Sequence, residues 1–324
     1  MNNYKEIFRT IVEQTRGYLK QNNIKTMVLG ISGGIDSTVT AAICREVQRQ
    51  FPKEEYRFIG VSLPCSSNAQ DERDSADSTI GAFCNYTDSI THNLQKEFSM
   101  IRGAFEDDYN WLKVAETKIA QGNIKARLRM MYLYNLASLT NGIVMDTDNL
   151  TEHYLGFWTI HGDVGDFNPI GGLWKHEVYG LAKWLANEYY QDFPEQMGNE
   201  ASRCINALRK AIVITPTDGN GVKVGGDLAQ IAPGLTYDQV DDVLIWFLNP
   251  KNNIKYYWKN YSEVDWPEHI RHSYYDICDK YGEDSVKMIV KRHMNSEFKR
   301  KRLPIAIERE EYKDNVVDQY QRLQ

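Results

Sequence analysis

The stretch best suited to chemistry is glycine-rich and runs from Gly30 to Ser37, reading Gly-Ile-Ser-Gly-Gly-Ile-Asp-Ser. Gly33 and Gly34 lack a Cβ, so they allow positive φ and let a ligand approach the backbone closely. Consecutive N–H groups in such a turn, at the start of a helix, form a concave site for anions. Asp36 adds a carboxylate, which suits bound phosphates if a hard cation such as Mg²⁺ lies between them. The stretch therefore predicts a phosphate site with an associated metal ion.

Local patterns predict the elements that hold this stretch. The apolar run 27–29 leads into it as a strand. Behind it, one face of a helix is predicted by apolar residues spaced four apart, namely Ile35, Val39, Ile43 and Val47. A turn with only a packing role is the alternative interpretation of the two glycines. The Asp-Ser pair that follows them favours the phosphate site.

The alternation of strands and helices continues along the chain. Further strands are predicted at 58–63 and 143–145, with a weaker one near 86–90. Further helices are predicted at 4–20, 68–80, 122–139, 173–186 and 233–248. We expect Asn123 to cap the helix 122–139, and its inward residues to be Leu128, Met131 or Tyr132, Leu136 and Leu139. The fold class predicted is α/β, a Rossmann-like open parallel sheet with helices on both faces.

A polar cluster, 146–152, follows the strand 143–145. Ligands of open α/β sheets gather at the carboxyl ends of strands, so this cluster would lie near the glycine-rich stretch if the two strands are neighbours. Glu152 would then supply a second carboxylate for Mg²⁺. Helix capping is the alternative role, and it explains Thr147 and Asp148.

Two cations are further candidates. Lys175 opens a predicted helix, where the helix dipole disfavours a positive charge, so it is a candidate phosphate ligand. It follows a loop, 156–170, whose glycines and aromatics suit a substrate pocket. Arg127 lies one position off the core residues of its helix; it projects into a cleft or is solvated.

Composition excludes several classes. The net charge of −6 argues against a general nucleic-acid binder, and the basic residues at 291–292 and 299–302 are interpreted as a solvated face. The chain has no apolar run of about 18 residues and no apolar segment at its start, so neither a membrane span nor a signal peptide is expected. The five cysteines are scattered without a Cys-x-x-Cys pair, which predicts a reduced, cytoplasmic protein without disulfides or zinc.

The string Ser-Gly-Gly-x-Asp-Ser at 32–37 resembles the pyrophosphate loop of the N-type ATP pyrophosphatases, and it lacks the lysine of a Walker A loop. Several stretches together resemble ammonia-dependent NAD synthetase, in the family's order: 30–37, 122–130, 147–166, 168–175, 216–217, 235–243 and 296–304. The resemblance implies an adenine-nucleotide alpha-hydrolase-like fold. It also implies one NAD synthetase domain over 1–324, with inserted or extended segments near 188–211 and 249–285.

The resemblance further implies a two-step amidation by a carbon–nitrogen ligase. The carboxylate of deamido-NAD attacks the α-phosphate of ATP and releases pyrophosphate, and ammonia then displaces AMP. No glutaminase domain precedes the loop, so free ammonia is expected as the nitrogen source unless a partner supplies it. ATP would be the co-substrate and Mg²⁺ the cofactor.

Residue roles follow from the same resemblance. Asp36 and Glu152 would hold Mg²⁺, and Asp163 would orient or deprotonate ammonium. The residues expected to bind ATP are Gly30, Ile31, Ser32, Gly33, Gly34, Ile35, Asp36, Ser37, Thr147, Lys175 and Thr217. The residues expected to bind deamido-NAD are Arg127, Asp166, Phe298 and Lys299.

The family is a homodimer with substrate bound across its interface, which implies the same here, without nucleic-acid or membrane partners. The chain departs from the family at Ile160 and Phe298, where lysine and histidine are frequent. A related amidoligase acting on nicotinate mononucleotide is therefore one alternative. A tRNA-modifying ATP pyrophosphatase is another, weakened by the absent cysteine pair. A non-catalytic nucleotide-binding regulator is a third, and the retained Asp36, Glu152 and Asp163 argue against it.

Overall fold

The computed structural model describes residues 3–215, 228 and 231–300. Its strands are β1 (Thr26–Gly30), β2 (Arg57–Ser62), β3 (Ser89–Thr91) and β4 (Gly142–Met145). The α-helices in the first half are α1 (Tyr4–Gln21), α2 (Ile35–Gln50), α3 (Gln70–Phe83), α4 (Gln95–Leu112), α5 (Lys118–Leu139) and α6 (Leu150–Leu155). Those in the second half are α7 (Lys175–Trp184), α8 (Gly198–Val213), α9 (Tyr237–Leu248), α10 (Ile254–Asn260), α11 (Glu268–Tyr281), α12 (Glu283–Asn295) and α13 (Glu297–Arg300).

The four strands form one parallel sheet in the order β3-β2-β1-β4. Strand β1 is central and pairs with β2 on one side and β4 on the other. The strand, turn and helix predicted around residues 27–47 are confirmed as β1 and α2. Because β1 and β4 are neighbours, the residues that follow each strand emerge side by side at the carboxyl edge of the sheet.

Helices cover both faces of the sheet because successive side chains of a strand point to opposite faces. Met27 and Leu29 of β1 belong to the cluster that packs against α1, α2, α7 and α8. Val28 between them belongs to a second cluster with residues of α4 and α5. The predicted open parallel sheet with helices on both faces is thus confirmed.

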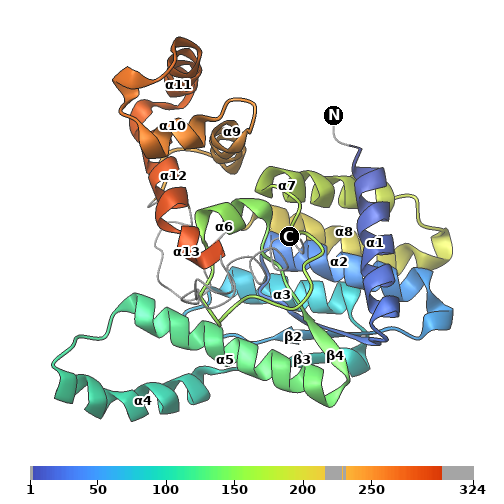
Figure 1. The fold of residues 1–324 in the computed structure, drawn as a ribbon. Coiled ribbons are helices and arrows are strands. Elements are labelled where there is room, and N and C mark those ends of the chain that lie inside the picture. The colour runs from blue at the N-terminus through green and yellow to red at the C-terminus, as the bar shows by residue number, and fades with distance from the viewer. Residues whose placement is uncertain (1–2, 216–227, 229–230, 301–324) are drawn as a thin grey trace, which may run out of the picture.

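The helices α9 to α12 form a further hydrophobic cluster of their own, rich in aromatic side chains, and project away from the sheet in Figure 1. Leu155 of α6 is fully buried in this cluster. Helix α6 thereby joins the helical cluster to the sheet. Among the residues described, every helix is too short or too polar to span a lipid bilayer.

Three local expectations are corrected. The weak strand near 86–90 is shorter and lies at Ser89–Thr91, after a 3₁₀ turn. Helix α5 begins at Lys118, because the Thr117 side chain accepts the Ala120 N–H, so Asn123 is no cap.

The inward face predicted for α5 is confirmed only in part. Leu128, expected inward, is buried in the cluster with the sheet, as are Met130, Leu133 and Ala137. Tyr132, the alternative to Met131, and Leu136 are partly buried against the same cluster. Met131 and Leu139, expected inward, are 64% and 75% exposed. Both apolar rows have helical spacing, so the periodicity alone did not distinguish the row that faces the sheet.

Candidate active site

A cleft of about 750 Å³ opens at the carboxyl edge of the sheet, where open α/β folds bind ligands. The glycine-rich stretch forms one wall and the segment after β4 forms another. The loop 156–165, the helices α3, α5 and α12, and the loop after β2 line the rest. The cleft therefore collects residues from both the sheet and the helical cluster.

The glycine-rich loop is held by hydroxyl groups from neighbouring elements. Gly33 has φ +88°, and Gly34, with φ −75°, is the N-cap of α2. Ser75 of α3 donates to the Gly33 carbonyl at 2.7 Å, and Ser37 and Thr38 donate to the Gly34 carbonyl at 3.1 and 2.9 Å. The carbonyl oxygens of Gly33 and Gly34 are thus hydrogen-bonded within the protein. This arrangement suits a loop whose N–H groups bind an anion.

Only glycine fits position 33, for two independent reasons. Its positive φ disfavours a side chain, and a Cβ there would lie 2.1 Å from the Glu72 carbonyl oxygen. We expect Gly33→Ala to lower the free energy of unfolding by at least about 2 kcal/mol, because the backbone conformation and the clash both oppose the native loop. Gly81→Ala on α3, where a Cβ meets nothing within 4 Å, is the matched control and should stabilise by about 0.5–1 kcal/mol. Urea denaturation of both variants measures the difference; equal stability would contradict the expectation.

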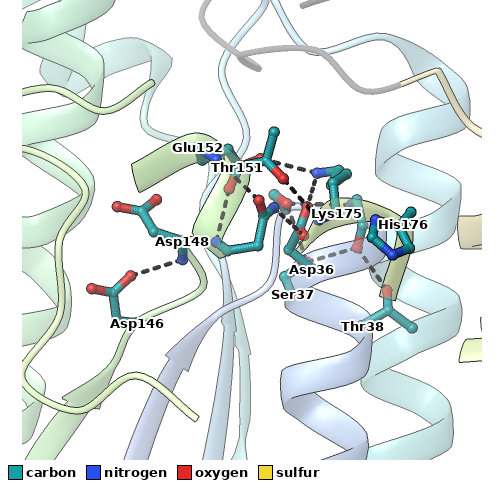
Figure 2. A network of polar contacts seen from close by, with 12 residues as sticks. Asp36, Ser37, Thr38, Asp146, Asp148, Thr151, Glu152, Lys175 and His176 are labelled. Atoms are coloured by element: carbon teal, nitrogen blue, oxygen red, sulfur yellow. Dashed lines mark hydrogen bonds and ion pairs between the residues drawn. The ribbon is translucent and has the colours of Figure 1, made fainter. Parts of the chain in front are cut away.

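Three predicted site residues from distant parts of the chain meet at the cleft wall (Figure 2). The Lys175 Nζ lies 2.5 Å from an Asp36 carboxylate oxygen and 2.9 Å from a Glu152 carboxylate oxygen. The lysine side chain is 1% exposed, and the two carboxylates are 15% and 13% exposed. The lysine is thus enclosed while both carboxylates reach the solvent of the cleft.

Helix α6 is capped by Asn149, which the sequence analysis did not identify. Its side chain accepts the Glu152 N–H at 3.1 Å, and Glu152 accepts the Asn149 N–H at 3.2 Å, forming a capping box. The proposed capping role of Thr147 and Asp148 is therefore wrong. The Asn149 side-chain amide also donates to Asp36 at 2.8 Å, so the cap fixes both carboxylates relative to each other.

The charge of Lys175 is stabilised by its neighbours. Burial alone would lower the pKa of Lys175, but Asp36 and Glu152 outweigh burial and raise it well above its ordinary value. The Tyr237 ring, with its centroid 5.2 Å from Nζ, adds a cation–π contact. The side chain thus remains a cation, as a phosphate ligand requires, although it begins helix α7.

Asp163 lines the same cleft and is set in the loop after α6. One carboxylate oxygen accepts the Thr159 N–H at 2.6 Å, and the Thr159 hydroxyl donates to Asn123 of α5 at 2.9 Å. Burial raises the pKa of Asp163 to about 7, opposed by the Thr159 N–H and by the positive charge of Lys299. A carboxyl with this pKa exchanges protons near neutral pH, as a general base does.

Of the other predicted ligands, Thr147 and Lys299 line the cleft, and so do seven of the eight loop residues, Gly33 being the exception. The Lys299 ammonium donates to the carbonyls of Gly156 and Trp158 at 2.9 and 2.5 Å, which fixes the loop after α6. Thr217 lies outside the described residues.

Three predicted substrate ligands lie away from the cleft lining. Arg127 is exposed and donates to the Ile160 carbonyl at 3.3 Å, so the structure favours neither a position in the cleft nor a free solvated side chain. Asp166 accepts the Val144 N–H at 2.9 Å, and Phe298 is 54% exposed. The cleft of one chain therefore does not bring these three together.

Arg129 is a cleft residue that the sequence analysis missed. Its guanidinium donates to the Leu63 carbonyl at 3.1 Å and to the Asn68 side chain at 3.2 Å, bracing the loop after β2. It stands two positions after Arg127 in the same motif. The correct phase of α5, which buries Met130, turns Arg129 toward the cleft.

Asp36 and Glu152 are the side chains best placed to hold a divalent cation. Within the described part of the chain there is no group of three or more histidine, cysteine, aspartate or glutamate side chains suited to a metal. Two carboxylates completed by substrate phosphates are typical of Mg²⁺ rather than of an all-protein metal site. The donor set therefore fits a cation that binds together with a nucleotide.

A protein-family comparison matches residues 7–203 to the NAD synthase family model. The NH(3)-dependent NAD(+) synthetase of Listeria monocytogenes serovar 1/2a is 34% identical over 245 residues, which cover 74% of this chain and 80% of that protein. The enzyme of the same name from Ectopseudomonas mendocina is 34% identical over 184 residues, 55% of this chain and 64% of its own length.

Two solved structures share the fold along nearly the whole chain. An NMN synthetase from Francisella tularensis superposes with a TM-score of 0.65 at 22% identity, covering 96% of this chain and 100% of that one. An NH3-dependent NAD synthetase from Campylobacter jejuni gives 0.62 at 21% identity, with 95% and 100% coverage. At these identities the two structures show the shared fold alone.

Proposed function

The chain belongs to the NAD synthase family, and we propose that it converts deamido-NAD to NAD with ATP and free ammonia, as an ATP-dependent carbon–nitrogen ligase. The observation that carries the proposal is the meeting of Asp36, Glu152 and Lys175 beside the glycine-rich loop, in one cleft with Asp163. The groups that would act on ATP and the base that would act on ammonia then lie in the same cleft, so both steps of the reaction can occur at one site.

The reaction has two displacements. An oxygen of the nicotinate carboxylate attacks the α-phosphorus of ATP, and the bond to the β-phosphate oxygen breaks with loss of pyrophosphate. The nitrogen of ammonia then attacks the carboxyl carbon of the acyl adenylate, and AMP leaves with the electron pair of the broken C–O bond. Adenylation is needed because a carboxylate oxygen is itself a poor leaving group.

We assign the phosphates of ATP to the loop Gly30–Ser37, with Thr147, Lys175 and Thr217 as further ligands. Lys175 supports this role because it stays charged although buried, and it neutralises the charge that grows on departing pyrophosphate. Asp36 and Glu152 would hold Mg²⁺ against the phosphates, and the ion would supply further charge neutralisation there.

We assign Asp163 the role of orienting ammonium and accepting its proton. Its carboxylate is fixed by the Thr159 N–H, which leaves the second oxygen for the incoming nitrogen. The raised pKa supports proton transfer near neutral pH.

The rate with ammonium should depend on the ionisation of Asp163. Burial raises its pKa from 3.8 to about 7, so below that pH the carboxyl is protonated and cannot act as a base. We expect kcat/KM for ammonium to fall about tenfold per pH unit below the pKa. Initial rates between about pH 5 and 9 at saturating ATP test this expectation.

Asp163→Asn is the control for that profile. The raised pKa means that folding favours the protonated carboxyl, so this stability is complete below pH 3.8 and is lost as the pH rises through about 7. The asparagine variant should therefore be more stable than the wild type at alkaline pH, while losing the acid limb of the rate profile. A wild-type rate that stays flat down to pH 5 (about two units below the pKa) would rule out Asp163 as the base.

We further propose that the active form is a homodimer with deamido-NAD bound across the interface. Arg127, Asp166 and Phe298 lie outside the cleft of one chain, which supports a contribution from a second copy. The α4–α5 hairpin carries exposed apolar side chains suited to such an interface, namely Met100, Phe105, Trp111, Leu112, Val114, Ile119, Met131 and Leu139.

Charge on this face should break the dimer. We expect Leu139→Glu combined with Met131→Glu to sediment as a monomer and to lose deamido-NAD turnover while keeping ATP binding. The control is Val264→Glu, an equally exposed apolar position at 77% that lies outside the hairpin. Sedimentation velocity measures the mass, and an unchanged dimer, or a wild-type monomer with full activity, would contradict the proposal.

We assign the reaction to the cytoplasm and treat residues 1–324 as one functional unit. The five cysteines are all free, which fits a reducing compartment. The cleft is lined both by the sheet and by α12, which supports a single unit rather than independent domains.

The decisive experiment incubates the purified full chain with ATP, Mg²⁺, an ammonium salt and either deamido-NAD or nicotinate mononucleotide. Product masses should show NAD, AMP and pyrophosphate, formed only when ammonium and Mg²⁺ are both present. Faster turnover of nicotinate mononucleotide would assign the related amidoligase activity instead. Release of ADP and phosphate would overturn the mechanism for either acid.

A further inference from the structure

Helix α9 belongs to the helical cluster, yet one of its faces is directed at the nucleotide site. Tyr237 and Asp241 are four residues apart and so lie on the same side of the helix. The Tyr237 ring faces the Lys175 ammonium, with the centroid at 5.2 Å. Asp241 is fully buried one turn further on.

The Asp241 carboxylate is bound to the start of α7. One oxygen accepts a hydrogen bond from the Thr151 hydroxyl. The other accepts the His176 N–H at 3.0 Å and lies 2.8 Å from the His176 Nδ1. The Thr151 oxygen in turn accepts the Lys175 N–H at 2.9 Å. The first two N–H groups of α7 are therefore capped by side chains of α6 and α9 (Figure 2 shows Thr151 and His176 beside Lys175).

These contacts support two of the three residues that meet at the cleft wall, Glu152 and Lys175. Thr151 precedes Glu152 on α6, and Lys175 and His176 open α7, so one carboxylate ties together the backbone that carries Glu152 and Lys175. Burial raises the pKa of Asp241, and the bonds from Thr151 and His176 oppose that rise. A carboxylate is an unfavourable choice for packing alone, because burying its charge costs free energy that an apolar residue avoids.

We propose that Tyr237 and Asp241 are positioning residues, which hold the Lys175 ammonium and the Glu152 carboxylate in register for the phosphates of ATP. The Tyr237 ring restricts the position of the Lys175 ammonium. Asp241, through Thr151, fixes the first residues of α7, from which the Lys175 side chain extends. Helix α9 thereby makes nucleotide binding depend on the docking of the helical cluster. The inference rests on the proposed role of Lys175 as an ATP ligand.

The test compares ATP binding and turnover in the full-length protein. Thr151→Val keeps the side-chain shape but removes the hydroxyl, and Asp241→Asn keeps the size but removes the charge. We expect each to raise the dissociation constant of ATP–Mg²⁺ roughly tenfold by calorimetry without acceptor, and to raise the KM for ATP similarly. Thr151→Ser, which restores the hydroxyl, is expected to recover the wild-type constant.

The neighbouring Asp242→Asn is the matched control. Asp242 is exposed on the same helix and pairs with Lys280 at 2.9 Å, so the same substitution there should leave ATP binding unchanged. Should a variant at 151 or 241 fail to fold, the half-buried Tyr237 offers Tyr237→Leu, expected to weaken ATP binding several-fold, with Tyr237→Phe retaining the ring.

A merely structural role predicts a different pattern. Variants that melt at lower temperature but bind and turn over ATP as the wild type does, per folded molecule, overturn the positioning role. Calorimetry measures ATP binding without an acceptor substrate. The positioning role and the proposed function are therefore tested by separate measurements. A wild type that binds ATP but forms no NAD refutes the proposed function alone, and weakened ATP binding in the variants would still support the positioning role.

Discussion

Asp36→Asn is expected to lower turnover by about a hundredfold or more while leaving the protein folded. The side-chain carboxylate pairs with Lys175 and accepts the Asn149 amide, so it is oriented into the cleft by two contacts from other elements. Asparagine keeps the shape but brings an amide where a negative charge is needed to hold a cation against phosphates. Lys175 keeps its pairing with Glu152, and the melting temperature should therefore change little.

The measurement is kcat as a function of Mg²⁺ concentration. If Asp36 is a metal ligand, the variant should need more Mg²⁺ for half-maximal rate, and saturation should restore only part of the turnover. Asp77→Asn, at an exposed position on α3, controls for the removal of a negative charge from the chain. Near-normal turnover of Asp36→Asn at low Mg²⁺ would remove Asp36 from the proposed metal site.

Lys175→Met is expected to reduce both activity and stability. Methionine matches the length of the side chain but leaves Asp36 and Glu152 facing each other without the cation that joins them at 2.5 and 2.9 Å. Removing one partner of a buried ion pair is strongly destabilising, and partial solvent access to the two carboxylates reduces that cost to about 2–3 kcal/mol. Turnover should fall at least about a hundredfold because a phosphate ligand is lost.

Two further measurements separate these effects. Added Mg²⁺ should raise the melting temperature of Lys175→Met more than that of the wild type, because the ion can replace the missing charge between the carboxylates. The double variant Lys175→Met with Glu152→Gln should regain stability by relieving the repulsion, yet remain inactive. A single variant as stable as the wild type without Mg²⁺ would show that the trio is not electrostatically coupled.

The sequence by itself predicted the features that depend on neighbouring residues. The strand, glycine turn and helix around Gly30–Ser37 follow from consecutive side chains, as does the parallel sheet from the alternation of elements. Chemical type and local position also nominated Asp36, Glu152 and Lys175. Each of these residues could be identified from its own short segment, because residue type, hydrophobic period and turn residues are all local properties of the sequence.

Where several residues were equally suited to a role by local sequence, the tertiary structure determined which of them has it. Thr147, Asp148 and Asn149 are all capping types, and the observed cap is Asn149, whose amide also meets Asp36. Helix α5 has two apolar rows, and contact with the sheet selected the one that buries Leu133 and exposes Leu139. Sequence periodicity gives no reason to prefer either option, because the packing partner lies elsewhere in the chain.

Only the tertiary fold brings the residues of the site together. Asp36 and Lys175 are 139 residues apart, and Thr151 and Asp241 are 90 apart. Their contacts exist because β1 and β4 are adjacent in the sheet and because α9 docks onto the junction of α6 and α7. A buried aspartate in an apolar helix has no local signature, since its partners are hydrogen-bond groups brought to it by packing. The residue types therefore came from the sequence, and the distances that allow them to act together came from the tertiary structure.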